Sequence, residues 1–174
     1  MKNILFTLMV FGILSLTRAH AGELQVGFAQ LSITPDLIDQ WVDVNNDAQF
    51  DPEIDLWTDV NGNGEFDAVW MAGFQNQRPA QGVKDNLMAV AVVIDDGKNR
   101  IGIVTADTVG LMRKFVLSVR EAIPPEWGLD YLMVHATHNH EGPDTQGLWG
   151  PSFFSSGVNH DYMQQLQQNI LDAL

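Results

Sequence analysis

The sequence predicts an α/β fold in which a mixed β-sheet has flanking helices and carries an acidic insertion. Three observations support this prediction: short apolar runs of strand length, two segments whose apolar residues recur at helical spacing, and a stretch of ten acidic residues that contains no Lys or Arg. The chain has 174 residues, which is enough for about one domain.

Four short runs have the length and residue types of strands. Residues 24–33 alternate apolar with small or polar residues and stop at a Thr-Pro pair. Residues 87–94 and 100–105 flank an Asp-Asp-Gly-Lys-Asn turn, which favours an antiparallel hairpin. Residues 131–137 follow a loop, and we predict that they form a buried strand.

Two later segments predict helices. Residues 110–123 show helical spacing and end at a Pro-Pro pair. Asn159 is predicted to cap a second helix, whose first turn carries Asp161. We expect this helix to run to the end of the chain. We also expect the chain to be a piece of a longer protein, because neither a capping glycine nor a basic last turn precedes Leu174.

The charge and the missing cysteines exclude several classes of function. The formal net charge is −13, and all 22 acidic residues lie beyond residue 21. A field of this sign repels phosphate backbones and anionic lipid surfaces, so nucleic acid is not an expected partner. Without cysteine there is no disulfide, thiolate zinc site or thiol nucleophile. Any metal must be bound by oxygen and imidazole.

Residues 1–21 have the features of a secretory signal peptide. Lys2 gives a positive start, residues 4–16 are almost entirely apolar, and Ala19-His20-Ala21 supplies small residues at a cleavage site. The apolar run is shorter than the ~20 residues that a spanning helix needs, so we expect no stable membrane span after its removal. The mature chain, residues 22–174, is predicted to be secreted or periplasmic.

The acidic segment contains two nine-residue frames, 43–51 and 59–67, at a spacing of 16. Each frame has side-chain oxygens at positions 1, 3, 5 and 9 and Phe at position 8, which is typical of a loop around Ca²⁺. Position 6, a sharp turn, is Gly64 in the second frame and Ala48 in the first. The alternative is a solvated acidic loop with this spacing by chance. The predicted calcium ligands are Asp43, Asn45, Asp47, Asp51, Asp59, Asn61, Asn63 and Asp67.

Two histidines follow the last predicted strand. His138 and His140 are two residues apart, so in an extended segment both imidazoles face one ion or one substrate. Catalytic zinc takes three protein ligands, and neutral imidazole is a common one. We therefore predict a metal-binding or catalytic role for this pair. His135 has the opposite parity and is expected to be a hydrogen-bonded core residue, and His160 a surface residue.

Spacing excludes some other metal sites. A metallo-β-lactamase would need Asp and His where this chain has Gly142 and Pro143. The three residues that name the HNH nucleases are far apart in those enzymes, and that activity suits a basic chain. A TIM-barrel amidohydrolase, with His-x-His after its first strand, remains open on spacing alone.

Six segments in order carry a resemblance to one family: residues 26–29, 32–35, 83–85, 89–95, 101–111 and 136–143. Together they resemble the amino-terminal part of the neutral/alkaline non-lysosomal ceramidases, a family of longer proteins. The His-x-His-x-Gly-Pro string that ends at Pro143 is the most specific match. Under this resemblance, residues 36–82 are an insertion found in a bacterial ceramidase-like branch.

The resemblance implies an enzyme in which Zn²⁺ activates water to split the amide of N-acylsphingosine. It implies that His138 is a zinc ligand and that His140 is catalytic and faces the substrate. The other zinc ligands and the active-site Ser of the family would lie beyond this chain, so residues 22–174 would be an incomplete catalytic domain, inactive by itself. Glu141 stands where the family has Ser, and Asp144 and Thr145 replace a glycine pair, so the mouth of the site is more acidic than in the family. Another amide or an ester is therefore an alternative substrate to ceramide. The competing hypothesis is a secreted calcium-binding structural module without catalysis.

Export with cleavage after Ala21 is directly testable. Mass spectrometry of the exported product should find Gly22 at its amino terminus, because signal peptidase accepts the small residues of Ala19-His20-Ala21. An intact Met1 on a cytoplasmic product would contradict the prediction.

Overall fold

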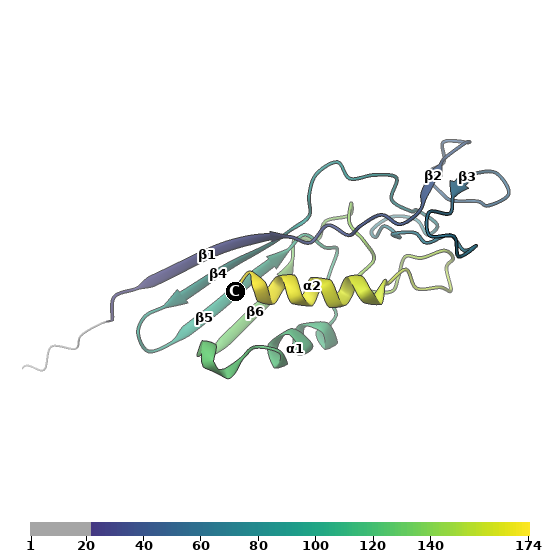
Figure 1. The fold of residues 1–174 in the computed structure, drawn as a ribbon. Coiled ribbons are helices and arrows are strands. Elements are labelled where there is room, and N and C mark those ends of the chain that lie inside the picture. The colour runs from purple at the N-terminus through teal and green to yellow at the C-terminus, as the bar shows by residue number, and fades with distance from the viewer. Residues whose placement is uncertain (1–21) are drawn as a thin grey trace, which may run out of the picture.

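The computed structural model describes residues 22–174, and the predicted signal peptide lies outside these residues. Its main feature is a four-stranded sheet in the order β1-β4-β5-β6, with a two-stranded sheet at the other end of the molecule (Figure 1). The four strands are β1 (Gln25–Ser32), β4 (Met88–Asp95), β5 (Arg100–Ala106) and β6 (Tyr131–Ala136). β1, β4 and β5 pair antiparallel, whereas β6 pairs parallel to β5. The predicted mixed sheet is confirmed.

Two helices and a short 3-10 turn accompany the sheet: α1 (Arg113–Glu121), η1 (Pro125–Trp127) and α2 (His160–Asp172). Asn159 caps α2 as predicted, because its side chain accepts the first free N–H groups of the helix. The prediction that this helix continues to the end of the chain is wrong, since α2 ends at Asp172. Within residues 22–174, neither helix has the length and apolar character needed to cross a bilayer.

The hydrophobic core lies between the sheet and the two helices, which cover the same face (Figure 1). Leu166 and Ile170 of α2 are fully buried in one cluster with Ala89, Ala91 and Val104 of the sheet. Small residues on β4 let the helix approach closely, so its larger side chains fill the space between the layers. The opposite face of the sheet carries exposed apolar side chains from its strands, namely Val26, Phe28, Ile101, Tyr131 and Met133.

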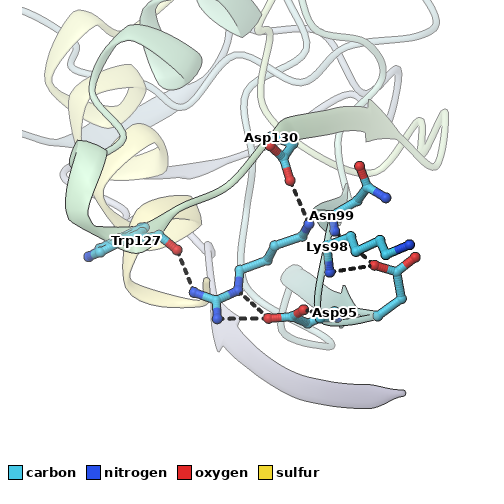
Figure 2. A network of polar contacts seen from close by, with 8 residues as sticks. Asp95, Lys98, Asn99, Trp127 and Asp130 are labelled. Carbon is cyan, nitrogen blue, oxygen red and sulfur yellow. Dashed lines mark hydrogen bonds and ion pairs between the residues drawn. The ribbon is translucent and has the colours of Figure 1, made fainter. Parts of the chain in front are cut away.

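Arg100 joins the two strands of the β4–β5 hairpin and links them to the loop before β6 (Figure 2). Arg100 pairs with Asp95 at 2.8 Å and donates to the carbonyl of Trp127, while its backbone N–H donates to Asp130. The backbone N–H of Gly97 and the Arg100 guanidinium lower the pKa of Asp95. These contacts tie the hairpin to the loop before β6, at the end of the sheet where that strand begins.

The acidic segment forms a small sheet of its own, which the sequence did not predict. β2 (Gln40–Val42) and β3 (Leu56–Thr58) pair antiparallel with Trp41 opposite Trp57. Phe50 and Phe66, which occupy position 8 of the two frames, stack with their ring centroids 3.9 Å apart. The two frames therefore share a small aromatic core.

Candidate functional site

His138 and His140 lie together just beyond the end of β6. Their Nε2 atoms are 3.2 Å apart, and their rings meet edge to face. The Nδ1 atom of His138 lies 2.7 Å from the carbonyl oxygen of Val109. Because a carbonyl only accepts, this Nδ1 carries the proton, and in the neutral imidazole of His138 the lone pair is then on Nε2. We call these two residues the histidine pair; the predicted convergence of its imidazoles is what the structure shows.

The reason given for that convergence is wrong. The prediction assumed an extended segment with a period of two, but β6 ends at Ala136 and His138 has a φ of 64°. A side chain with Cβ is strained in this left-handed region by about 1–2 kcal/mol, so surrounding contacts must hold the residue there. One is the backbone N–H of Asn139, which donates to the carbonyl of Thr108.

The other two histidines of the described chain lie away from the pair. His135 is on β6, and its Nε2 lies 2.9 Å from the hydroxyl of Thr105 on β5. The predicted hydrogen bond is therefore present, but the residue is exposed on the sheet rather than in the core, so that part of the prediction is wrong. His160 begins α2 and is exposed, as predicted.

Residues 70–80 of the acidic insertion contact His140 and hold it in place. Arg78 donates from one guanidinium nitrogen to the carbonyls of both Ala72 and His140, each at 2.7 Å. Its guanidinium lies 4.7 Å from the centre of the Phe74 ring, which in turn packs edge to face on His140. A Cβ on Gly73 would lie 2.4 Å from the imidazole of His140, so only glycine fits there. Sequence reasoning missed this support.

Asp144 anchors the loop that follows the pair. It is fully buried, and its carboxylate accepts four backbone N–H groups, from Gln146, Gly147, Trp149 and Gly157. Its own N–H donates to the carbonyl oxygen of Trp70. The sequence did not predict this role, which follows from the four N–H groups that the buried carboxylate accepts.

A cavity of about 850 Å³ opens beside the string that holds the histidine pair. Thr137, Asn139 and Glu141 line it, together with Lys84 and Asp85, and the pair itself is not part of its lining. Alternate residues of this segment therefore serve different surroundings: Thr137, Asn139 and Glu141 line the cavity, whereas His138 and His140 contact each other. The cavity walls come from separate parts of the chain, so no local sequence pattern predicted them.

The two acidic frames have the same backbone conformation. Position 4 has a positive φ in both, 59° at Asn46 and 74° at Gly62. Position 6 does as well, 60° at Ala48 and 80° at Gly64. Glycine adopts this region freely and alanine does not, so the first frame is the strained copy.

The side chains of the two frames also make equivalent hydrogen bonds. At position 1, Asp43 accepts the N–H of Ala48 and Asp59 accepts that of Gly64, both at 2.8 Å. In both frames the side-chain oxygen at position 3 accepts the N–H of position 5, and that at position 5 accepts the N–H of position 7. At position 9, Asp67 accepts the side-chain amides of positions 3 and 5 of its frame. These bonds bring the side chains of positions 3, 5 and 9 together in the second frame, whereas in the first frame Asp51 instead accepts the N–H of Glu53.

Two buried carboxylates brace the frames from outside, and the sequence prediction missed them. Asp55 accepts the N–H groups of Val44 and Asp51 in the first frame. Asp39 accepts those of Val60 and Asp67 in the second frame. Asp39 and Asp55 are themselves 16 residues apart, the spacing of the frames, so extending the repeat by four residues would have found them.

Side-chain geometry does not yet define a metal centre. Within residues 22–174, no group of three or more His, Asp or Glu side chains is placed so that it could hold a metal ion. The histidine pair supplies two imidazoles, and the frames would need amide and carbonyl oxygens in addition to their carboxylates.

Comparison with known proteins identifies the fold. The chain is similar to a ceramidase structure described as complexed with C2, with a TM-score of 0.57 and 18% identity over 87% of this chain and 20% of that one. It is also similar to neutral ceramidase from Pseudomonas aeruginosa, with a TM-score of 0.58 and 17% identity over 86% of this chain and 20% of that one. No family model and no curated protein sequence matches it.

The resemblance to neutral ceramidases that the sequence predicted is confirmed at the level of the fold. The described chain has the fold of one part of a neutral ceramidase: a mixed sheet with two helices. It spans about a fifth of the length of the ceramidase structures that it matches.

Replacing the buried carboxylate of Asp144 should destabilise the loop that it anchors. Asp144→Asn removes the charge that four N–H groups share, and we expect it to lower the free energy of unfolding by about 2–3 kcal/mol in urea titrations. The matched control is Asp85→Asn, an exposed position, with an effect within about 0.5 kcal/mol. Equal effects of the two variants would contradict the role given to Asp144.

Proposed function

We propose that this chain belongs to a secreted, zinc-dependent amidohydrolase of neutral ceramidase type. In this proposal the enzyme hydrolyses the amide of N-acylsphingosine or of a related lipid amide. Residues 22–174 alone have no hydrolytic activity in this proposal. The observation that carries the proposal is the convergence of His138 and His140 on one point, within a fold shared with neutral ceramidases.

The donor chemistry of the histidine pair fits a zinc ion. The bond from Nδ1 of His138 to Val109 leaves its Nε2, which faces the Nε2 of His140, as the nitrogen that would bind a cation. A carbonyl partner of this kind is common behind zinc-bound histidines. His138 would hold the ion, as the resemblance implies. Zinc bound there would lower the pKa of a water molecule toward neutrality and polarise an amide carbonyl.

The residues around the pair would orient it rather than react. Arg78 fixes the carbonyl of His140, and Gly73 leaves room for its imidazole, so the ring can lie beside that of His138. His138 supplies only one of the three protein ligands that catalytic zinc takes. We therefore place the remaining ligand or ligands in other parts of a complete enzyme.

The zinc proposal predicts different results for the two histidines. In a protein of ceramidase length that carries this chain, His138→Ala should remove both zinc, measured per chain by atomic absorption, and hydrolysis of N-acylsphingosine. His140→Ala should retain most of the zinc and lower kcat by at least about 100-fold, because general acid–base groups contribute roughly 10²–10⁴.

His160→Ala is the matched control, since His160 is exposed at the start of α2 and should affect neither zinc nor hydrolysis. A zinc-free wild-type protein, or full activity in His138→Ala, would overturn the zinc proposal. Stoichiometric, tight zinc binding by residues 22–174 alone would show that two imidazoles and their neighbours suffice, contrary to the incomplete site proposed here.

We propose in addition that the acidic insertion binds Ca²⁺ through its two frames. The shared backbone, with positive φ at positions 4 and 6, curls each frame so that its side-chain oxygens gather. Bound cations would also offset the repulsion among ten carboxylates in 32 residues. In this proposal calcium stabilises the insertion, and residues 70–80 of that insertion support the histidine pair.

Calcium should raise the melting temperature of the chain, because a ligand that binds only the folded state stabilises it by about 2.7 kcal/mol at 100 times its dissociation constant. Asp43→Ala combined with Asp59→Ala should abolish this shift. Ala48→Gly is the matched variant: it relieves the strained turn of the first frame and should tighten calcium binding. An unchanged calcium response in the double variant would contradict the proposal.

The two measurements also separate the two candidate functions. A calcium-binding structural module without catalysis predicts a calcium response together with a zinc-free protein at every chain length. The enzyme predicts zinc and hydrolysis in the complete protein, whatever the affinity for calcium.

A further inference from the structure

The loop after the histidine pair presents two bare aromatic rings. Phe153 and Phe154 are 81% and 94% exposed, the largest exposed fractions among the large apolar side chains of residues 22–174. Their rings contact one another edge to face, with centroids 5.2 Å apart. Two neighbouring phenylalanines in water at the tip of one turn are uncommon without a partner surface.

The turn that carries the two rings is held by its own hydrogen bonds. The hydroxyl of Ser152 donates to that of Ser155, and the N–H of Ser155 donates to the carbonyl of Ser152. At the base of the loop, a Cβ on Gly150 would lie 2.2 Å from the carbonyl oxygen of Ser155, so only glycine allows this close approach. The rings therefore sit on a folded loop, and binding them costs little ordering entropy.

The same loop reaches the histidine pair through its base. The indole N–H of Trp149 donates to the carbonyl of Phe74, whose ring packs on His140. Phe74 and Leu148 are themselves 57% and 60% exposed. Exposed apolar side chains therefore occur beside the pair, at Phe74, and along the loop, at Leu148, Phe153 and Phe154.

The charge of this loop differs from that of the rest of the chain. No ionisable residue occurs from Thr145 to Asn159, in a chain with a formal net charge of −13. An uncharged, aromatic, serine-flanked tip matches the interface of a bilayer, where aromatic rings enter among the headgroups. The surrounding negative charge selects against anionic lipid.

We propose that the Phe153–Phe154 tip inserts into the interface of a zwitterionic lipid surface and so brings the histidine pair to the membrane. The choice of a lipid surface rests on the proposed function, in which the substrate is a lipid amide. The two exposed rings would insert only shallowly. Because the buried carboxylate of Asp144 holds the loop in place, the inserted tip would keep the site close to the lipid surface.

The test is co-sedimentation of residues 22–174, the predicted exported product, with phosphatidylcholine vesicles. Wild type should partition into the vesicle pellet, and Phe153→Ser with Phe154→Ser should lower the partition coefficient by at least about tenfold, because two rings leave the interface. Vesicles that contain phosphatidylserine should bind less. All variants carry the same amino terminus, so differences between them report on the loop.

Two further variants keep the test decisive. Phe153→Trp with Phe154→Trp should retain binding, since tryptophan suits the interface as well as phenylalanine does. Phe28→Ser is the matched control: it removes an exposed ring from β1 and should leave partitioning unchanged. Because Phe153 and Phe154 are exposed, their replacement should leave the melting temperature as in wild type.

Three outcomes would overturn the proposal. They are equal partitioning of wild type and the double serine variant, an equal loss in Phe28→Ser, and concentration-dependent self-association through the two rings without vesicle binding. Because vesicle binding is measured without turnover, loss of hydrolysis with binding retained would reject the proposed function alone. Hydrolysis of a water-dispersed short-chain amide by the complete enzyme, together with no vesicle binding, would reject the lipid inference alone.

Discussion

The structure depends on buried carboxylates that satisfy the backbone of irregular segments. Asp144 does so for the loop after the histidine pair, and Asp39 and Asp55 do so for the two acidic frames. A buried N–H without an acceptor costs about as much as a lost hydrogen bond, and these loops have no neighbouring strand to supply one. A carboxylate with two oxygens can accept several N–H groups at once, so one residue fixes a whole loop.

This constraint links the acidic insertion to the site. Asp144 accepts N–H groups from its own loop and donates its N–H to Trp70, while Arg78 binds the carbonyl of His140. The insertion is thus part of the support of the histidine pair as well as a pair of acidic frames. A change that loosens residues 70–80 reaches the imidazole of His140 through Gly73, where a Cβ would overlap the ring.

Helices and strands with a regular spacing of apolar residues were predicted well, because that spacing reflects burial of one face of the element. β1, the β4–β5 hairpin, β6 and the capped start of α2 all follow the pattern read from the sequence. α1 is shorter than its spacing suggested: it begins at Arg113, preceded by Met112, which provides no capping side chain. β2 and β3 have three residues each, too few for a period to show. Their pairing places Trp41 opposite Trp57, and each of these rings packs on the phenylalanine of one frame.

The site was predictable only in its residue types. The His-x-His string pointed to a converging pair, but convergence arises from the left-handed backbone of His138 and from the carbonyl of Val109, neither of which a spacing rule contains. Arg78 is 62 residues from its partner His140, so its role appears only after folding. A left-handed residue stays strained unless its surroundings hold it, and here those surroundings come from the segments after β5 and within the insertion. The orientation of the pair is therefore a property of the folded chain, because the contacts that fix it, from Val109 and Arg78, come from segments far from the string.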